Sequence, residues 1–334
     1  MTGVRPATLR VGVLGAARIN SSALIAPAGR IEGIEIAAIA ARDPHRARSF
    51  AAEHRIAQVH ADYESLLADD RIDAVYVPLP AALHGRWTLA AIRAGKHVLC
   101  EKPFTANAPE AEQVAAAAAS TDTVVMEAYH SFHHPLRRRL QEIVGGGMLG
   151  RIHSAKASFC VPIPPGRDIR WDLDLGGGGL LDVGYYPLRM LRDLLGSDPS
   201  VDAVEARSRG GIDRVMRAVL RFEGNVRAEV VSSIWSRRLF ASVLAVHGSE
   251  GRLRVSSPYH PQMGSVVRVD RGGIRTREGT TRRATYDYQL EAFRDAVRGH
   301  APVLTGAPEA VAQMRVIDEL YTAAGLEPRR PLQA

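Results

Sequence analysis

A lysine directly before a proline is the first feature of this chain that suggests chemistry. Lys102 follows the apolar run HVLC (97–100) and a glutamate, and among 43 basic residues only Lys96 and Lys156 are also lysines. A partly buried lysine can release a proton at a working pH, whereas arginine stays protonated. Because a residue before proline is biased toward extended backbone, Lys102 is predicted to continue a strand into a ligand cleft. The alternative is a solvated charge at the strand end.

A glycine-rich stretch in the second half, GGGGLLDVGYYP (176–187), offers a carboxylate and a phenol. Consecutive glycines allow the backbone to approach a ligand closely before it turns into a helix. Asp182 and Tyr186 are four residues apart, so they share one face of the predicted helix. Such a pair can position a substrate oxygen and protonate it. The alternative is a glycine hinge before an amphipathic helix that Asp182 caps.

The turn after the first predicted strand, VGVLGAARIN (11–20), is a degenerate dinucleotide fingerprint. That fingerprint needs one glycine for a tight turn, a second for close approach to pyrophosphate and a small third residue for packing. Gly15 fits the first role, whereas Ala17 and Asn20 replace the other two glycines. An ordinary strand–helix turn is the alternative. The residues expected to bind the cofactor here are Gly15, Ala16, Ala17, Arg18 and Ile19.

The end of the second predicted strand, ARDPHR (41–46), bears on the type of cofactor. An acid there usually binds the ribose hydroxyl of NAD, whereas a base accommodates the extra phosphate of NADP. Asp43 precedes Pro44 and is best explained as a helix N-cap. Arg42 and Arg46 can then clamp a phosphate through charge-assisted hydrogen bonds. The pattern favours NADP(H) over NAD(H), the alternative being that both arginines are merely solvated.

The elements that must position these residues alternate in the first half of the chain. Strands that alternate with helices predict an α/β fold with a doubly wound parallel sheet, whose ligand site lies at the carboxyl ends of the strands. The predicted strands are residues 9–14, 34–39, 73–77, 97–100 and 123–127. The predicted helices are residues 18–26 (just before Pro27), 46–53, 63–68, 84–94 and 109–119.

The second half has the two-residue periodicity of antiparallel strands, so we expect an α+β domain with a large, open, mainly antiparallel sheet. Strands are predicted at 152–161, 201–207, 214–222, 226–234, 241–247 and 266–269, helices at 178–195, 286–299 and 308–324, and a solvated hairpin or loop at 271–283. We therefore expect a dinucleotide-binding domain (1–128) and a substrate and oligomerisation domain (129–334), whose last segment returns to the first domain.

Composition excludes several classes of protein. Of the 334 residues 46% are apolar and 24% charged, which is ordinary globular composition, and no apolar run or signal-like N-terminus points to a membrane or secretion. The cysteines, Cys100 and Cys160, cannot form a disulfide framework, so a cytoplasmic protein is expected. The net charge of +7 comes without a nucleic-acid-binding motif. His130, His133 and His134 lack a standard ligand spacing, so no metal is expected.

Taken together, the motifs resemble those of the Gfo/Idh/MocA oxidoreductase family from residue 9 to about residue 325. The matching stretches are GVLGAARI (12–19), AARDPHRA (40–47), DAVYVPLPAALH (73–84), AGKHVLCEKP (94–103), MEAYHSFHHP (126–135) and GGGGLLDVGYY (176–186). The resemblance implies a Rossmann domain followed by an α+β domain whose open sheet commonly forms the oligomer interface, and hence a homodimer or homotetramer.

The resemblance also implies roles for individual residues. Lys102 would be the catalytic lysine, Asp182 would orient the substrate, and Tyr186 or Lys102 would donate the proton. Further cofactor contacts are expected from Leu79, Pro80, His84, Glu101 and Lys102, and substrate contacts from Tyr129, Arg170, Trp171, Asp182 and Tyr186.

The implied activity is hydride transfer between a nicotinamide and a carbinol or carbonyl carbon of a sugar-like substrate. We expect reduction of a keto-sugar, and the alternative is oxidation of D-xylose or of a trans-dihydrodiol. A protein of another class, a sensor or scaffold that binds NADP(H) without turnover, would share the fold, because fold does not dictate function. Such a sensor would not need Lys102, Asp182 and Tyr186 together.

Overall fold

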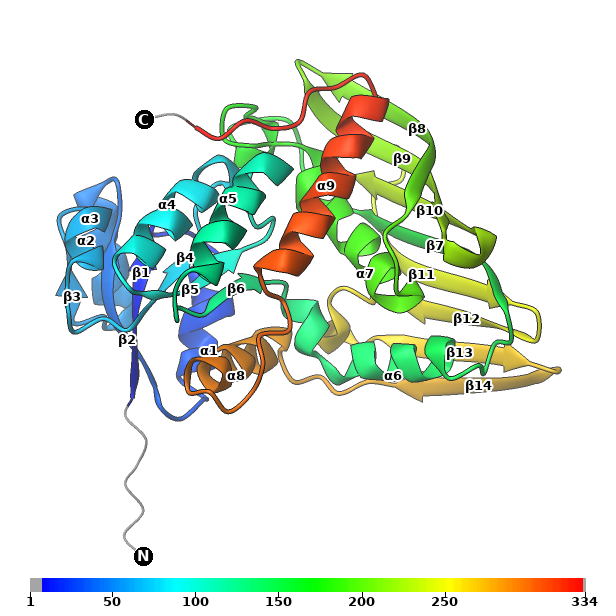
Figure 1. Ribbon diagram of the computed structural model, residues 1–334, viewed down its shortest axis with the longest axis horizontal. Helices are drawn as coiled ribbons and strands as arrows, with labels where there is room; N and C mark the ends of the chain where they lie inside the picture. The colour runs from blue at the N-terminus through cyan, green and yellow to red at the C-terminus, as the bar shows by residue number, and fades with distance from the viewer. Residues whose placement is uncertain (1–7, 333–334) are drawn as a thin grey trace, which may run out of the picture.

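The first half of the chain forms a six-stranded parallel sheet in the computed structural model, which describes residues 8–332 (Figure 1). The strand order is β3-β2-β1-β4-β5-β6, the doubly wound order that the alternating pattern predicts. The strands are β1 (Leu9–Leu14), β2 (Ile34–Ala40), β3 (Gln58–Val59), β4 (Ala74–Val77), β5 (His97–Glu101) and β6 (Val125–Ala128). The two-residue β3 is too short for a periodicity signal and was not predicted.

Helices cover both faces of this sheet. One face packs against α3 (Tyr63–Leu67), α4 (Ala81–Arg93) and α5 (Ala108–Ala119), and the other against η1 (Ser21–Ile25), α1 (Ala26–Ala28) and α8 (Thr285–Val297). The first helix begins later than predicted and continues through Pro27, which is tolerated in the first turn of α1. Asp43 caps α2 (Pro44–His54) as expected, because its carboxylate accepts from the backbone N–H groups of His45 and Arg46.

The second half is built on an eight-stranded sheet with the order β14-β13-β12-β11-β7-β10-β9-β8. All neighbouring strands are antiparallel except the parallel pair β7 and β10, so the expected α+β class is confirmed. The strands are β7 (Ile152–Cys160), β8 (Ser200–Arg209), β9 (Ile212–Phe222), β10 (Val226–Ser233), β11 (Ala241–Gly248), β12 (Gly251–Ser256), β13 (Val266–Arg271) and β14 (Ile274–Gly279). Strand β12 was not predicted, and of the two readings for 271–283 the hairpin is correct.

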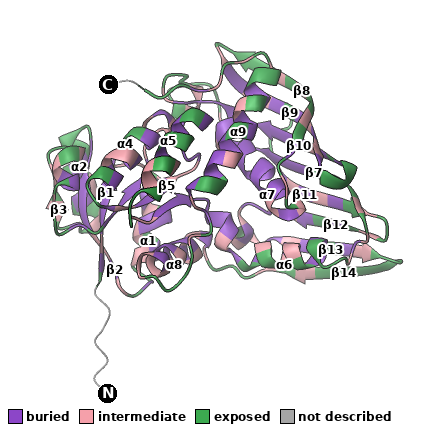
Figure 2. Cartoon of the chain, viewed as in Figure 1, coloured by how far each residue is buried: buried purple, intermediate pink, exposed green. Residues whose placement is uncertain are grey.

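Three helices lie on the same side of this sheet: α6 (Pro135–Gly145), α7 (Tyr185–Leu195) and α9 (Ala307–Ala323) (Figure 1). Almost all of α7 is buried (Figure 2). The predicted helix 178–195 is divided into a π-helical turn, η4 (Leu180–Gly184), and α7. Helix α6 was missed, although its Pro135 follows an N-cap, His134. The remaining turns are η2 (His130–His133), η3 (Ile169–Trp171), η5 (Glu223–Asn225) and η6 (Pro261–Met263).

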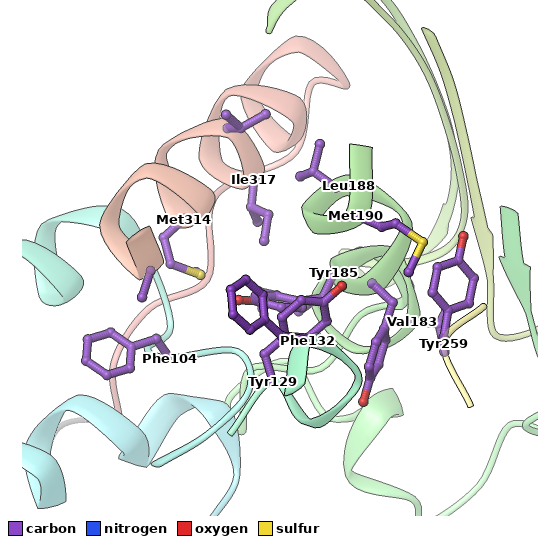
Figure 3. Packing of buried hydrophobic residues seen from close by; sticks show 14 of the residues in the cluster. Phe104, Tyr129, Phe132, Val183, Tyr185, Leu188, Met190, Tyr259, Met314 and Ile317 are labelled. Atoms are coloured by element: carbon purple, nitrogen blue, oxygen red, sulfur yellow. The ribbon is translucent and has the colours of Figure 1, made fainter. Parts of the chain in front are cut away.

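The two halves share one buried cluster. Phe104, which follows β5, packs with Met314 and Ile317 of α9 and with Tyr185 of α7 in this cluster (Figure 3). Polar contacts cross the same region, because Arg315 of α9 pairs with Glu112 of α5 at 2.7 Å. The end of the chain also reaches the first half, where the Leu332 N–H donates to the Ala82 carbonyl. The carboxyl ends of the parallel strands therefore face a wall that the second half supplies.

A search of residues 8–332 for a helix both long and apolar enough to cross a membrane finds none.

Candidate active site

A cavity lies between the carboxyl ends of β4 and β5 and a loop of the second half. The first half contributes Leu79, Pro80, Ala81, His84, Lys102 and Pro103, and the second half contributes Ile169, Arg170, Leu175, Gly176, Gly177, Gly178, Leu181 and Asp182. This is the position at which a doubly wound sheet binds its ligand. The structure thus brings the Glu-Lys-Pro motif and the glycine-rich motif together at one cavity.

Lys102 extends from the end of β5 to the glycine-rich segment. Its ammonium donates to Asp182 Oδ1 at 2.8 Å and to the Asp182 carbonyl at 3.0 Å. The side chain is only 11% exposed, so the solvated surface charge considered for this lysine is not what the structure contains. Lys102 Nζ also lies 5.1 Å from the centre of the Tyr186 ring, within the range of a cation–π contact. Lys102, Asp182 and Tyr186 therefore form one constellation.

Asp182 is buried between two cations. Its second oxygen, Oδ2, accepts from Arg170 Nε at 2.5 Å, and Arg170 is held in turn by Asp168. Burial by itself would raise the pKa of Asp182, but the charges and hydrogen bonds of Lys102 and Arg170 outweigh it and lower that pKa to about 2. The carboxylate is therefore ionised at neutral pH, where it fixes the Lys102 ammonium in one place. It lies inside η4 and does not cap a helix.

Tyr186 presents its hydroxyl in the same region, and its ring packs against Phe159 and Tyr259. Its Oη lies 3.2 Å from Nε2 of His130. Burial raises the pKa of Tyr186 well above its ordinary value of 10, and the nearby Tyr286 and Glu101 raise it further. The phenol is therefore protonated at neutral pH and is a proton donor rather than a base in the free protein.

Of the five predicted substrate residues, Arg170 and Asp182 line the cavity, whereas Tyr129, Trp171 and Tyr186 are not among its lining residues. Tyr129 is 1% exposed and packs against the rings of Tyr185 and Tyr186 from the core side. Trp171 is half-buried, and its indole N–H donates to the Ile163 carbonyl. In this structure Tyr129 supports Tyr186, and Trp171 anchors the loop that carries Arg170.

The glycine turn after β1 has the geometry of a close-approach loop. Gly15 has φ +115°, and a Cβ there would lie 3.0 Å from Leu79 Cδ2 and 3.7 Å from the Tyr63 hydroxyl. The Asn20 side chain donates to the Gly15 carbonyl at 2.7 Å. Arg46 Nη2 donates to the Ala16 carbonyl at 2.9 Å, so this arginine reaches the turn from α2. A side chain at Gly15 would fill the space that an incoming group needs.

The other predicted cofactor residues range from exposed arginines to a buried histidine. Arg42 is exposed, and the Arg18 side chain is 93% exposed with its nearest acid, Asp168, at 3.8 Å. His84 is buried, and its two ring nitrogens lie 2.6 Å from the carbonyls of Leu79 and Pro103. His84 thus ties the loop after β4 to the segment that carries Lys102. Pro80 is the N-cap residue of α4.

Glu101 lies beside this constellation as the last residue of β5. Its Oε1 accepts from the Tyr76 hydroxyl at 2.7 Å. Burial raises the pKa of Glu101 to about 7, although the hydrogen bond from Tyr76 and the charge of Lys102 oppose that rise. The carboxyl group is therefore close to half-ionised at neutral pH.

Sequence reasoning did not single out several groups that the fold brings here. Tyr63, His260 and Tyr286 lie in none of the matching stretches, and Tyr76 lies in DAVYVPLPAALH (73–84) but was given no role. The contacts of Tyr76, His260 and Tyr286 join distant segments of the chain. The three histidines considered for a metal point to different partners: His130 to Tyr186, His133 to Thr305, and His134 to the backbone of Leu136. A search of the described residues for a cluster of three or more metal-binding side chains finds none.

A doubly wound sheet, a close-approach glycine turn and a Lys-Asp-Tyr constellation at the strand ends define a nicotinamide-dinucleotide oxidoreductase. Comparison with family models gives the particular family: the chain belongs to the Gfo/Idh/MocA oxidoreductases. Residues 9–129 match the model of the oxidoreductase family with an NAD-binding Rossmann fold, and residues 137–254 match the Gfo/Idh/MocA C-terminal domain. The resemblance predicted from the motifs is confirmed.

Curated relatives cover nearly the whole chain. A D-xylose 1-dehydrogenase (NADP(+)) of Haloferax volcanii is 36% identical over 94% of this chain and 96% of its own length. A dTDP-3,4-didehydro-2,6-dideoxy-alpha-D-glucose 3-reductase of Actinomadura kijaniata is 34% identical over 95% and 96%. A crystal structure of a 3-ketoreductase from Actinomadura kijaniata, in complex with NADP and TDP-benzene, superposes with a TM-score of 0.88 at 31% identity, covering 95% of this chain and 98% of that one.

Proposed function

We propose that this protein is an NADP(H)-dependent oxidoreductase that transfers hydride between the nicotinamide and a carbinol or carbonyl carbon of a sugar-like substrate. Reduction of a keto-sugar is the form we favour. The observation that carries the proposal is the contact of the Lys102 ammonium with Asp182 at 2.8 Å, beside the Tyr186 ring, at the end of β5. A sensor that only binds NADP(H) would not need this constellation, and the NADP(+) and 3-ketoreductase relatives support turnover.

The residues around the first turn fit a dinucleotide. Gly15, bounded on one side by Leu79 and Tyr63, has no side chain that would stand between the backbone and an approaching diphosphate. Arg46, already bound to the Ala16 carbonyl, and the exposed Arg42 would hold the additional phosphate of NADP. When bound, the nicotinamide supplies the hydride chemistry, and the protein supplies orientation and proton management.

Tyr186 and Lys102 would supply the proton to the substrate oxygen. In the reducing direction Tyr186 donates its phenolic proton to the substrate oxygen as that oxygen gains negative charge. The Lys102 ammonium, fixed by Asp182, donates a hydrogen bond to the same oxygen and is the alternative proton donor. Arg170 keeps Asp182 ionised and so keeps Lys102 in place. Glu101 and His84 would shape the nicotinamide side of the cavity.

Titration with NADPH and NADH, followed by fluorescence, tests the cofactor. We expect NADPH to bind at least about tenfold more tightly, a difference of roughly 1.4 kcal/mol. Arg46→Ala should remove most of that preference without weakening NADH. Tighter binding of NADH would overturn the assignment of NADP, and binding of neither by folded protein free of retained nucleotide would overturn the oxidoreductase proposal.

Turnover is tested with D-xylose, a trans-dihydrobenzenediol and a dTDP-linked 3-keto-sugar, each with the appropriate form of NADP. Activity with the keto-sugar supports the form we favour, whereas activity with the diol or the aldose supports the two dehydrogenase alternatives.

Lys102→Met should lower kcat by about a hundredfold or more, in the range of positioned proton transfer. A variant that keeps wild-type turnover would contradict the role of Lys102, and tight NADPH binding without any turnover would favour the sensor.

The organisation of the molecule is also a proposal. We place the boundary between the dinucleotide domain and the substrate domain after residue 128, where β6 ends, with the last segment returning to the first domain.

The face of the eight-stranded sheet opposite α6, α7 and α9 presents exposed arginines of β9, β12 and β13. We assign this face the contact of a homodimer or homotetramer. Light scattering on purified protein tests this, and a monomer at micromolar concentration would contradict it. Two buried free thiols suit a reducing cytoplasm.

A further inference from the structure

His130 is placed against the hydroxyl of Tyr186 by the turn that follows β6. Its Nε2 lies 3.2 Å from Tyr186 Oη, and the side chain is 1% exposed. Its ring is packed between the rings of Tyr286, at 4.4 Å, and His260, at 5.3 Å between centroids. The orientation of His130 is therefore held by packing from three separate elements, and only one of its nitrogens faces the catalytic constellation.

The hydrogen-bond partners of the two ring nitrogens of His130 determine which nitrogen carries the single proton. Within the described part of the chain, Nδ1 has no hydrogen-bond partner. A buried N–H without an acceptor is rarer and less favourable than a buried acceptor without a donor, and the hydrogen bond of one nitrogen determines the tautomer. The proton therefore belongs on Nε2, which donates to Tyr186 Oη. With that lone pair of Oη occupied, the Tyr186 hydroxyl hydrogen is free to point toward another acceptor.

The surroundings of His130 also keep the imidazole neutral. Burial lowers the pKa of His130 well below 6.5, and the neighbouring His260 and the Lys102 ammonium lower it further. The groups that face or adjoin it are Tyr186 on α7, Tyr286 on α8, His260 before η6, Lys102 after β5, and His133 and His134 on its own turn. None of these is a carboxylate, so nothing in this group of neighbours favours the imidazolium form.

We propose that His130 is a positioning residue for the reaction: its Nε2–H directs the Tyr186 hydroxyl toward the substrate oxygen and then stabilises the phenolate. This rests on the proposed function. Hydride from a bound NADPH would add to the substrate carbonyl carbon and move the C=O π electrons to oxygen; the Tyr186 O–H bond then breaks as the substrate O–H bond forms. The negative charge left on Oη is held by the hydrogen bond from His130 and by the nearby Lys102 ammonium. Water returns the proton to Tyr186 before the next turnover.

A first experiment examines the tautomer without any need for activity. Long-range ¹H–¹⁵N spectra of protein labelled with ¹⁵N-histidine distinguish the two neutral tautomers, and His130→Gln identifies the signals of His130 by their loss. We expect a neutral ring protonated on Nε2 at pH 7, with a shift of that signal in Tyr186→Phe. A ring protonated on Nδ1, or an imidazolium at pH 7, would overturn the proposal.

A second experiment separates positioning from packing. His130→Phe keeps a ring in the same space but removes the donor, whereas the amide of His130→Gln can replace the Nε2–H. With the substrate turned over in the screen above, we expect the phenylalanine variant to lose kcat by about ten- to a hundredfold with an unchanged KM for NADPH, the range for a hydrogen bond to a charged group. The glutamine variant should recover most of that loss.

Two controls complete the test. His133→Phe removes a neighbouring histidine of the same turn and should leave kcat within twofold of wild type. His130→Phe should cause no further loss in a Tyr186→Phe background, because residues that act through one another are not additive. Additive losses, or a glutamine variant as slow as the phenylalanine variant, would overturn the role of His130. If NADPH binds and no substrate is turned over, the proposed function fails and this role fails with it, while the tautomer is still decided by the spectra.

Discussion

The pKa values of two carboxyl groups beside Lys102 are shifted in opposite directions by their immediate surroundings. Asp182 receives hydrogen bonds from Lys102 and Arg170, which overcome the effect of burial and lower its pKa to about 2. Glu101 is partly buried with the neutral hydroxyl of Tyr76 as its donor, and burial raises its pKa to about 7. Two groups of one chemical type therefore differ in pKa because their environments differ, as acids and bases in active sites commonly do.

The raised pKa of Glu101 predicts a pH-dependent cost to stability. Below about pH 4.5 the carboxyl is protonated in both the folded and the unfolded chain. Between pH 4.5 and 7 the unfolded chain binds fewer protons, so the free energy of unfolding falls as pH rises, and the loss levels off above pH 7. We expect Glu101→Gln to raise Tm relative to wild type by several degrees more at pH 8 than at pH 5.

Thermal unfolding at the two pH values measures that difference. Glu223→Gln is the matched control, because Glu223 is exposed on the turn between β9 and β10, and its Tm difference from wild type should not depend on pH. An equal change in Tm at pH 5 and pH 8 for Glu101→Gln would show that its carboxyl ionises normally in the folded protein.

At the scale of elements, two irregular segments matter: the turn between β1 and η1 contacts Leu79 of the cavity wall, and the π-helical turn η4 carries Asp182. The helix after β1 begins later than its sequence suggests, which leaves residues 15–20 as an open turn. The segment with Asp182 winds as a π-helix, yet Asp182 and Tyr186 both face Lys102, as a spacing of four predicts. Irregular helical turns of this type are frequent at functional sites.

Gly15→Ala tests whether the first turn must stay open. A positive φ strains any side chain, and the new methyl group would also crowd Leu79 at 3.0 Å in the space proposed for the diphosphate. We expect NADPH affinity, measured by fluorescence titration, to fall by at least about tenfold, with NADH affected equally because both share the diphosphate.

Gly95→Ala provides the comparison for backbone strain alone. Gly95 has φ +69° at the end of α4, and a Cβ there would meet nothing within 4 Å. This variant should lose a similar amount of stability, about 1 kcal/mol, and bind NADPH normally. Loss of NADPH affinity in both variants would mean that reduced stability, and not crowding of the turn, accounts for the effect.

Across the whole molecule, the end of the chain secures the glycine-rich segment. Arg329 is buried and donates to the carbonyls of Gly177 and Gly211 and to Asp213 Oδ1, at 2.6, 3.1 and 2.9 Å. Asp213 accepts in turn from the Leu180 N–H, at the start of η4. Arg329 therefore holds the glycine-rich segment that forms one wall of the cavity. The same end of the chain contacts the first half through Leu332.

Arg329→Met should be strongly destabilising. It removes the cation that Asp213 faces in the interior and leaves the Gly177 carbonyl without its donor. Breaking a buried ion pair by removing one partner costs about 3–5 kcal/mol, which urea denaturation would measure. Arg330→Met is the control, since the adjacent arginine pairs with Glu327 at the surface and should change stability by less than about 0.5 kcal/mol. Similar losses in the two variants would contradict this view of Arg329.

The features that could be predicted from the sequence are those that depend on neighbours along the chain. Alternation of strands and helices, the cap at Asp43 and the extension of β5 toward Lys102 are local properties, so the fold class and the position of the lysine were predictable. Strand β3, with two residues, is too short to show a periodicity. Helix α6 was missed although its eleven residues carry an N-cap, a first-turn proline and buried apolar residues at helical spacing.

The sequence by itself therefore determined the class of fold and the residues able to do chemistry, because periodicity, caps and side-chain type are local. Only the tertiary structure decided which of them meet. It joined Lys102 to Asp182 across 80 residues, His130 to Tyr186 across 56, and Arg329 to Gly177 across 152. It also left Tyr129, Trp171 and Tyr186 outside the set of residues that line the cavity. Contacts of this range depend on how the two sheets and α9 pack together, which no local stretch of the chain encodes.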